Sequence, residues 1–170
     1  MGALLTGVTV VAAVDAETGQ VHGMTANAFM SVSMEPPLVV LGVGRAAHMH
    51  GVLERSGTFG VSILLEGQEE LALHMAGKET DTRAVEFAHL GAGPVLVQCL
   101  ASLSATIVST IVAGDHSLVV GEVTRLDGPR GQVRALAFHR GRLAPFQAAG
   151  SVWKVDMEDV WAGSLRSSWG

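Results

Sequence analysis

The sequence lacks several kinds of residue that stabilise or functionalise small proteins. Its 170 residues include one cysteine and no tyrosine, and only 16% are charged. A single cysteine excludes an intrachain disulfide and provides no cysteine pair for a zinc site. Eleven basic against sixteen acidic residues leave a net charge of −5. We therefore expect no nucleic-acid partner, because phosphate neutralisation dominates such binding.

Long apolar runs are also missing. Every apolar stretch falls short of the roughly 18 residues that a membrane span needs. The first apolar stretch has no Lys or Arg before it, unlike a secretory signal. We expect no membrane partner, and the lone cysteine fits a reducing, cytoplasmic location.

The chain is otherwise rich in apolar residues, which make up 48% of it, enough for one packed domain. We place this domain at residues 1–148 and a C-terminal tail at residues 149–170. All three tryptophans lie in the tail, and its apolar residues recur at helical spacing: Trp153, Met157, Val160, Trp161 and Leu165. The tail is therefore predicted to be helical and packed on the domain or on a dimer partner, with a lid over a ligand as the alternative.

Short apolar runs separated by turn residues predict a mostly β fold. The expected strands are residues 7–14, 21–29, 38–43, 59–64, 95–112, 116–126 and 135–139. Two short helices are expected at residues 46–55 and 68–75. Many short strands with small helical inserts favour a closed β-barrel over a doubly wound parallel sheet. The alternation of apolar and polar residues slips at residues 108–111, which predicts a β-bulge or a bend in a long strand.

Two stretches are unusual for a plain core. Residues 23–37 (GMTANAFMSVSMEPP) place small and hydroxyl residues at near-alternating positions, so the backbone can approach a flat ligand closely. The alternative is an ordinary hairpin arm and loop. His116 follows the turn residues Gly114 and Asp115, where a side chain can meet a ligand at a strand end or can simply be solvated.

No catalytic constellation is visible from residue spacing alone. The seven histidines are scattered, and His48 and His50, two residues apart, fall on different faces of a helix. We expect no metal site.

Four segments occur in an order that resembles a known family: TGVTVV (6–11), HGMTANAFMSVSMEPPLVVL (22–41), GDHSLVVGEV (114–123) and HRGRL (139–143). Over residues 5–145 the chain resembles the flavin reductase family with the FMN-binding split-barrel fold. This family includes the reductase components of two-component flavin monooxygenases. The resemblance implies a six-stranded antiparallel split β-barrel that forms a homodimer. It also implies an NAD(P)H:flavin oxidoreductase that transfers a hydride from NADH or NADPH to FMN or FAD and supplies reduced flavin to a monooxygenase.

The same resemblance assigns site residues. His116 matches the family histidine near the flavin and nicotinamide and is the catalytic candidate. The flavin-binding candidates are Thr25, Ala26, Asn27, Ser31, Ser33, Arg45, Ala46, Ala47, His48, Met49, Arg83, His139 and Arg140. Residues 45–50 are expected to face the flavin phosphate, because a helix N-terminus and an arginine both favour an anion.

The sequence departs from the family pattern in the expected phosphate loop. Where relatives commonly have hydroxyl residues, this chain has Arg45-Ala46-Ala47-His48-Met49. Leu143 also stands where the family often has tyrosine. Two alternatives therefore remain: a split-barrel protein that binds a flavin or another ligand without reducing it, and an assembly partner of an oxygenase.

Overall fold

The computed structural model describes residues 3–82, 84–128 and 134–146. Most of the described chain is strand, with two short helices, as the sequence predicts. The elements are β1 (Thr6–Gly7), β2 (Thr9–Val14), β3 (Val21–Ala26), β4 (Phe29–Met34), β5 (Pro37–Gly44), α1 (His48–Ser56), β6 (Thr58–Ile63), α2 (Glu69–Met75), β7 (Phe87–Leu90), β8 (Gly93–Leu96), β9 (Ala101–Ala113), β10 (His116–Asp127), β11 (Leu136–His139) and β12 (Arg142–Pro145). The predicted tail lies outside the described residues.

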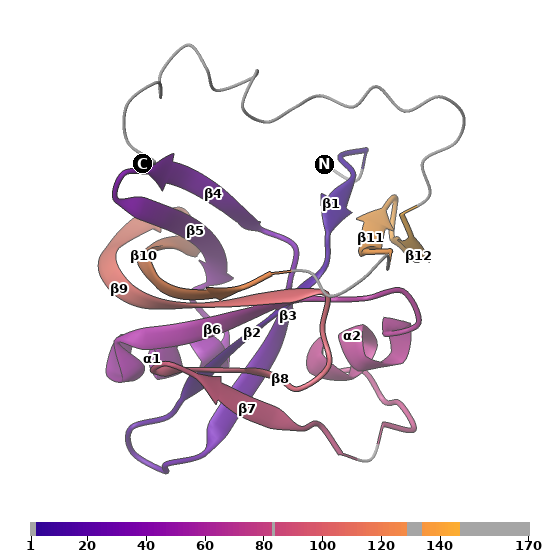
Figure 1. Cartoon of the computed structure of the whole chain (residues 1–170), viewed down its shortest axis with the longest axis horizontal. Coiled ribbons are helices and arrows are strands. Elements are labelled where there is room, and N and C mark those ends of the chain that lie inside the picture. Colours follow the sequence, from indigo (N-terminus) through magenta and orange to yellow (C-terminus); the bar gives the residue numbers. More distant parts are fainter. Residues whose placement is uncertain (1–2, 83, 129–133, 147–170) are drawn as a thin grey trace.

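The main sheet has seven antiparallel strands in the order β3-β2-β6-β9-β10-β5-β4. Its edge strands β3 and β4 are consecutive in the chain and are joined only by Asn27 and Ala28. This link spans at most about 11 Å, whereas the edges of a flat seven-stranded sheet are about 29 Å apart. The sheet must therefore curl until its two edges approach (Figure 1).

The mostly antiparallel β architecture is confirmed, with two differences from the expected barrel. The sheet has seven strands rather than six, and within the described residues its hydrogen-bond ladder does not close. It stays open because the two edge strands, β3 and β4, do not pair with each other. A three-stranded sheet, β1-β11-β12, and a hairpin, β7-β8, complete the described fold.

The core lies inside the curled sheet. Phe59 and Leu41 are fully buried there, and α1 adds Met49, Val52 and Leu53 from one face. That face is the one predicted from the spacing of these three residues. Figure 1 shows α1 and α2 on opposite sides of the molecule, with β11 and β12 on the α2 side.

A close backbone crossing holds β8 against β6. A Cβ atom added at Gly60 would lie 1.9 Å from the carbonyl oxygen of Pro94, and one added at Gly93 would lie 2.5 Å from that of Phe59. Both distances are too short for any side chain, so only glycine permits this crossing. The sequence predicts one continuous strand over residues 95–112. The crossing explains why β8 instead packs as a separate short strand.

The long hairpin β9-β10 contains the predicted bulge. Val120 pairs with Ser109 and Gly121 pairs with Ile107, so Val108 is the extra residue. Gly121 also makes room for the buried ring of Phe59, which lies 2.6 Å from where a Cβ atom would be. The bulge lies where the buried first half of β9 gives way to a largely exposed second half.

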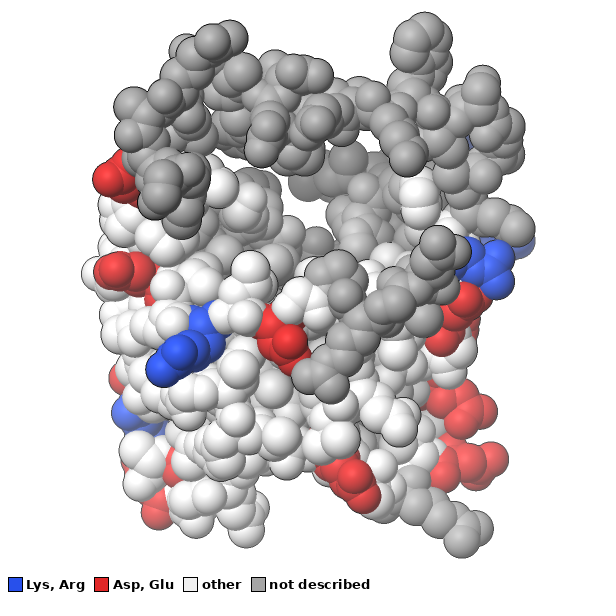
Figure 2. All heavy atoms as spheres, viewed as in Figure 1, with Lys and Arg blue, Asp and Glu red and all other residues white. Residues whose placement is uncertain are grey.

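Three strands, β4, β7 and β12, were not predicted from the sequence. In place of β7 the sequence indicated a loop or broken helix over residues 78–90. Neither α1 nor α2, the helices of the described chain, is long and apolar enough to cross a membrane. Acidic side chains are scattered over the face drawn in Figure 2, and most of that face is uncharged.

Candidate functional site

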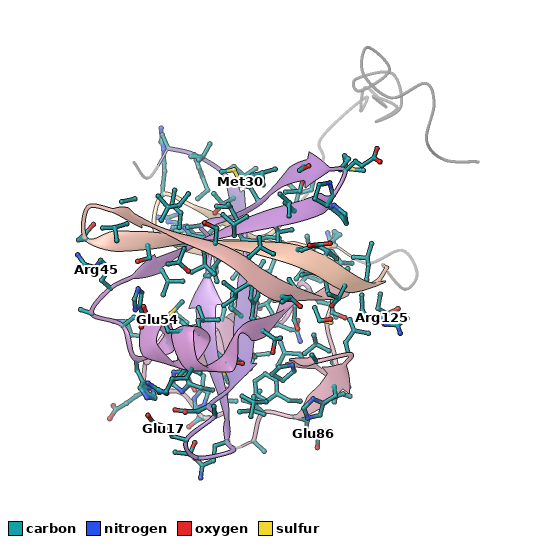
Figure 3. The ribbon with its side chains drawn as sticks, turned by 90° about the vertical axis from the view of Figure 1, so that its left-hand side faces the viewer. Glu17, Met30, Arg45, Glu54, Glu86 and Arg125 are labelled. Atoms are coloured by element: carbon teal, nitrogen blue, oxygen red, sulfur yellow. The ribbon has the colours of Figure 1, made fainter. Side chains whose placement is uncertain are left out.

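The structure brings together the expected phosphate loop and the His116 turn, which are far apart in sequence. Strands β5 and β10 pair so that Gly44 lies opposite His116. The backbone N–H of Arg45 donates a hydrogen bond to the carbonyl oxygen of Asp115 at 2.9 Å. A Cβ atom on Gly44 would lie only 3.9 Å from Nε2 of His116. Figure 3 shows Arg45 beside the tip of the β9-β10 hairpin.

Helix α1 begins directly after this loop and has no side-chain cap. Its N-cap residue, Ala47, is extended at φ −74° and ψ 140°, the usual N-cap conformation, but it carries no hydroxyl or carboxylate. The first N–H groups of any helix lack intrahelical acceptors, so this end attracts an anion. With the exposed Arg45 beside it, the loop has the chemistry of an anion site.

His116 is held in one orientation by its neighbour. Its Nδ1 lies 2.8 Å from Oδ1 of Asp115, and about half of the His116 side chain is exposed. The hydrogen bond to His116 lowers the pKa of Asp115 below its usual value. Because Nδ1 faces this carboxylate, Nε2 is the ring nitrogen available to a ligand.

The link from β3 to β4 runs beside β5 and continues the β4-β5 pairing. Gly42 donates its N–H to the carbonyl oxygen of Ala28 at 2.8 Å, and a Cβ on Gly42 would lie 3.1 Å from that of Ala28. Asn27 and Ser31 are exposed, and Ser33 is half-buried. Small side chains thus line the link, as expected for a surface on which a flat ligand could rest.

Thr25 and Ala26 of the small-residue stretch form hydrogen bonds with other elements of the fold. The Thr25 hydroxyl donates to the carbonyl oxygen of Ala72 in α2 at 2.7 Å, and the carbonyl of Ala26, which is buried, accepts from the Thr9 hydroxyl at 2.8 Å. The hydroxyl proton of Thr25 is therefore used to anchor α2.

His48, the first residue of α1, turns towards β3. Its ring meets that of His22 edge-to-face, with 4.5 Å between centroids. Burial lowers the pKa of His22, and the neighbouring His48 lowers it further, while Asp15 acts in the opposite direction. The ring of His48, a candidate for the phosphate loop, thus packs against the ring of His22.

Three predicted residues are not placed at this site. His139 and Arg140 lie at the turn between β11 and β12, in the separate sheet on the other side of the molecule from α1 (Figure 1). Arg83 lies outside the described residues. Within the described chain, no group of three or more His, Cys, Asp or Glu side chains could hold a metal ion.

His50 ends the loop expected to face the phosphate, but its contact with β10 was not predicted. Its Nε2 lies 2.9 Å from Oγ of Ser117, the residue after His116. It also lines a cavity of about 360 Å³ with Glu54, Ile107 and Thr110. None of the predicted flavin-binding residues lines that cavity. No sequence pattern signals a contact between side chains 67 positions apart.

An uncapped helix end beside an arginine, a surface of small residues and an oriented imidazole together have the chemistry that a flat, phosphorylated ligand requires. The family model described as "Flavin reductase like domain" matches residues 1–147. The chain belongs to this flavin reductase-like family.

Individual relatives agree with this assignment. An NADH-dependent flavin reductase from Rhodococcus sp. is 42% identical over 127 residues, covering 74% of this chain and 72% of the relative. The reductase component of 4-hydroxyphenylacetate 3-monooxygenase from Thermus thermophilus is 41% identical over 121 residues. The match covers 71% of this chain and 76% of the relative. The solved NADH:FAD oxidoreductase SgcE6 from Streptomyces globisporus, in complex with NAD and FAD fragments, has a TM-score of 0.77. It is 36% identical, and the match covers 88% of this chain and 90% of that one.

Proposed function

We propose that this protein is an NADH-dependent flavin reductase that reduces FMN or FAD and supplies the reduced flavin to a monooxygenase. The observation that carries the proposal is the pairing of Gly44 with His116, which joins the anion-binding loop to the oriented imidazole. Relatives named as NADH-dependent flavin reductases and as a monooxygenase reductase component support it.

The residues present fit a flavin phosphate through backbone groups and one guanidinium. Arg45 and the N–H groups at the start of α1 would hold the phosphate, since Ala46, Ala47 and Met49 offer no side-chain donor. The small residues at the link from β3 to β4, including Ala26, would leave room for the ring system. Asn27, Ser31 and Ser33 would supply the polar contacts along it.

The chemistry belongs to the bound molecules, because an oxidised flavin accepts a hydride from a nicotinamide when the two rings are stacked. The protein contributes proximity and orientation, which can account for most of such a rate enhancement. Asp115 fixes the His116 ring, so that Nε2 can donate to or accept from the ligands beside Gly44. Because the protein contributes orientation rather than proton transfer, the reaction needs no acid–base pair.

A homodimer would complete the site. Large apolar side chains are about half exposed or more along β4 and the second half of β9: Met30, Val32, Met34, Val108, Ile111 and Val112. Exposed apolar surface of this kind marks protein interfaces, and we assign it to a second copy of this chain. His139 and Arg140 lie in the other sheet, so a contact with the same flavin would come from the partner subunit. We place the protein in the cytoplasm, where NADH is available.

The test is NADH oxidation by the purified protein with FMN, FAD or riboflavin, followed by NADH absorbance. Turnover with at least one flavin is expected, faster with NADH than with NADPH. Absence of turnover with every flavin and both nicotinamides would overturn the proposal. Tight flavin binding without turnover would favour the binding-protein alternative, which the hydroxyl-free phosphate loop motivates.

A further inference from the structure

A single side-chain hydrogen bond ties helix α1 to the strand that carries His116. His50 projects from the first turn of α1, and its Nε2 lies 2.9 Å from Oγ of Ser117 on β10. We propose that this hydrogen bond is a clamp that positions the anion-binding loop against the His116 turn and so sets the affinity for the flavin phosphate. This inference rests on the proposed function for its ligand.

The clamp closes a ring of contacts around the loop. At one end, the N–H of Arg45 donates to the carbonyl of Asp115 at 2.9 Å. Within the loop, the N–H of Ala47 donates to Gly44 at 2.9 Å, and the N–H of His50 donates to Ala47 at 3.0 Å. At the other end, the His50 ring meets Ser117. Without that last contact, the loop is fastened to the His116 turn at one end only.

The hydrogen bond between His50 and Ser117 is directional, and burial makes its loss costly. The Ser117 residue is 1% exposed and the His50 side chain 16%, and a buried hydroxyl that loses its partner is costly. Helix α1 packs on the core through the apolar Met49, Val52 and Leu53, and the ion pair of Arg55 with Asp15 holds its last turn at the β2-β3 turn, away from β10. Apolar packing is non-directional, so it does not by itself fix how far α1 can slide along β10.

Glu54 supports the orientation of the ring from the solvent side. Its Oε2 lies 3.7 Å from Nδ1 of His50, one helical turn away, and its side chain is 61% exposed. Exposed pairs of this kind contribute little. We therefore assign the positioning role to the His50–Ser117 contact and give Glu54 a minor one.

The clamp predicts a selective effect on flavins that carry phosphate. Riboflavin has no phosphate, so its affinity should not depend on the position of residues 44–49. The variants His50→Ala and Ser117→Ala should weaken FMN binding about fivefold, the worth of one hydrogen bond. Riboflavin binding should change less than twofold. A general loss of structure would weaken both.

The binding experiment measures dissociation constants for FMN and riboflavin by quenching of flavin fluorescence. His50→Gln keeps a donor at the Nε2 position and should restore FMN affinity. The double variant of His50→Ala and Ser117→Ala should be no weaker than either single variant, because both remove the same contact. His74→Ala is the matched control, since His74 on α2 makes the same kind of bond with Thr80 at 3.1 Å. Equal loss for FMN and riboflavin, or additive loss in the double variant, would overturn the clamp.

A second measurement needs no flavin. Amide hydrogen exchange at Arg45 and Ala47 in the free protein should accelerate about fivefold in Ser117→Ala and stay unchanged in His74→Ala. If the wild-type protein binds no flavin, the proposed function fails, and this measurement still decides whether the clamp exists. Unchanged exchange at both amides would overturn it.

Discussion

Arg55 of α1 and Asp15, which follows β2, form a two-pronged ion pair. Nε lies 3.2 Å from Oδ1, and Nη2 lies 2.9 Å from Oδ2. Gly51 makes room for it, because a Cβ atom there would lie 3.1 Å from Nη1 of Arg55. The glycine that weakens α1 as an isolated helix is thus the residue that lets α1 bind the β2-β3 turn.

Replacing Asp15 should destabilise the fold in a pH-dependent way. The Arg55 guanidinium lowers the pKa of Asp15 below its ordinary value. The stabilisation is therefore fully present above about pH 4 and is lost as the pH falls through the lowered pKa. Asp15→Asn should lower the thermal midpoint clearly near pH 7 and much less near pH 2. Glu17→Gln is the control, because Glu17 is 71% exposed and 3.6 Å from Arg55. An equal loss at both pH values would contradict this prediction.

His22 should make the protein less stable in mild acid. Its folded pKa is lowered by burial and then by the charge of His48, against the opposing effect of Asp15. Below about pH 6.5 the unfolded chain therefore binds more protons at this position, and stability falls as the pH falls. His22→Phe keeps a ring against His48 without this titration, so its thermal midpoint should decline less between about pH 7 and pH 5. The exposed His89 on β7 provides the control His89→Phe. The thermal midpoint of this variant should decline as much as that of the wild type.

Ala47 separates helix capping from phosphate binding. Ala47→Ser and Ala47→Asp both place a good N-cap on α1 and should each stabilise the fold by about 1 kcal/mol in urea unfolding. Serine adds a neutral donor and should tighten FMN binding, whereas aspartate adds a negative charge and should weaken it. Riboflavin affinity should change little in both. The same sign of change in FMN affinity for both variants would show that the phosphate lies elsewhere.

His116 should act on the reaction more than on flavin binding. His116→Ala should slow flavin reduction by NADH about 10- to 100-fold, the cost of losing alignment, while the flavin dissociation constant changes less than about threefold. Stopped-flow absorbance and fluorescence titration measure the two quantities. His89→Ala is the control and should leave both unchanged. A rate equal to that of the wild type would remove His116 from the site.

The exposed apolar residues of β9 should lie in the dimer interface. Ile111 is 52% exposed, and Ile111→Glu should convert a dimer to a monomer in sedimentation velocity experiments. Leu126 is 71% exposed at the other end of the β9-β10 hairpin. Leu126→Glu should therefore sediment as a dimer, like the wild type. If Ile111→Glu stays dimeric, the second copy binds another surface.

The fold was largely predictable where local pattern determines structure. The slip in alternation located the bulge at Val108, and the spacing of Met49, Val52 and Leu53 identified the buried face of α1. The separation of β8 from β9 could not be predicted, because the position of β8 depends on the contact between Gly60 and Gly93. Glycines that permit a close crossing look like any other glycines in a sequence.

The proximity of candidate site residues was predictable only where the family motifs extend. The resemblance named residues 45–50 and His116, and the pairing of β5 with β10 places Arg45 beside the His116 turn. It also listed Thr25, but the hydroxyl proton of that residue is used by Ala72. The contact between His50 and Ser117 joins a helix to a strand and leaves no local periodicity, so only the tertiary structure shows it.

The short link through Asn27 and Ala28 also bears on the solubility of the protein. An exposed sheet edge that is long and straight is a template for aggregation. Here the link ties the first edge strand to the last, so the sheet cannot flatten without breaking the chain. Each edge is thereby kept twisted and close to the other, and the fold limits its own tendency to stack edge to edge.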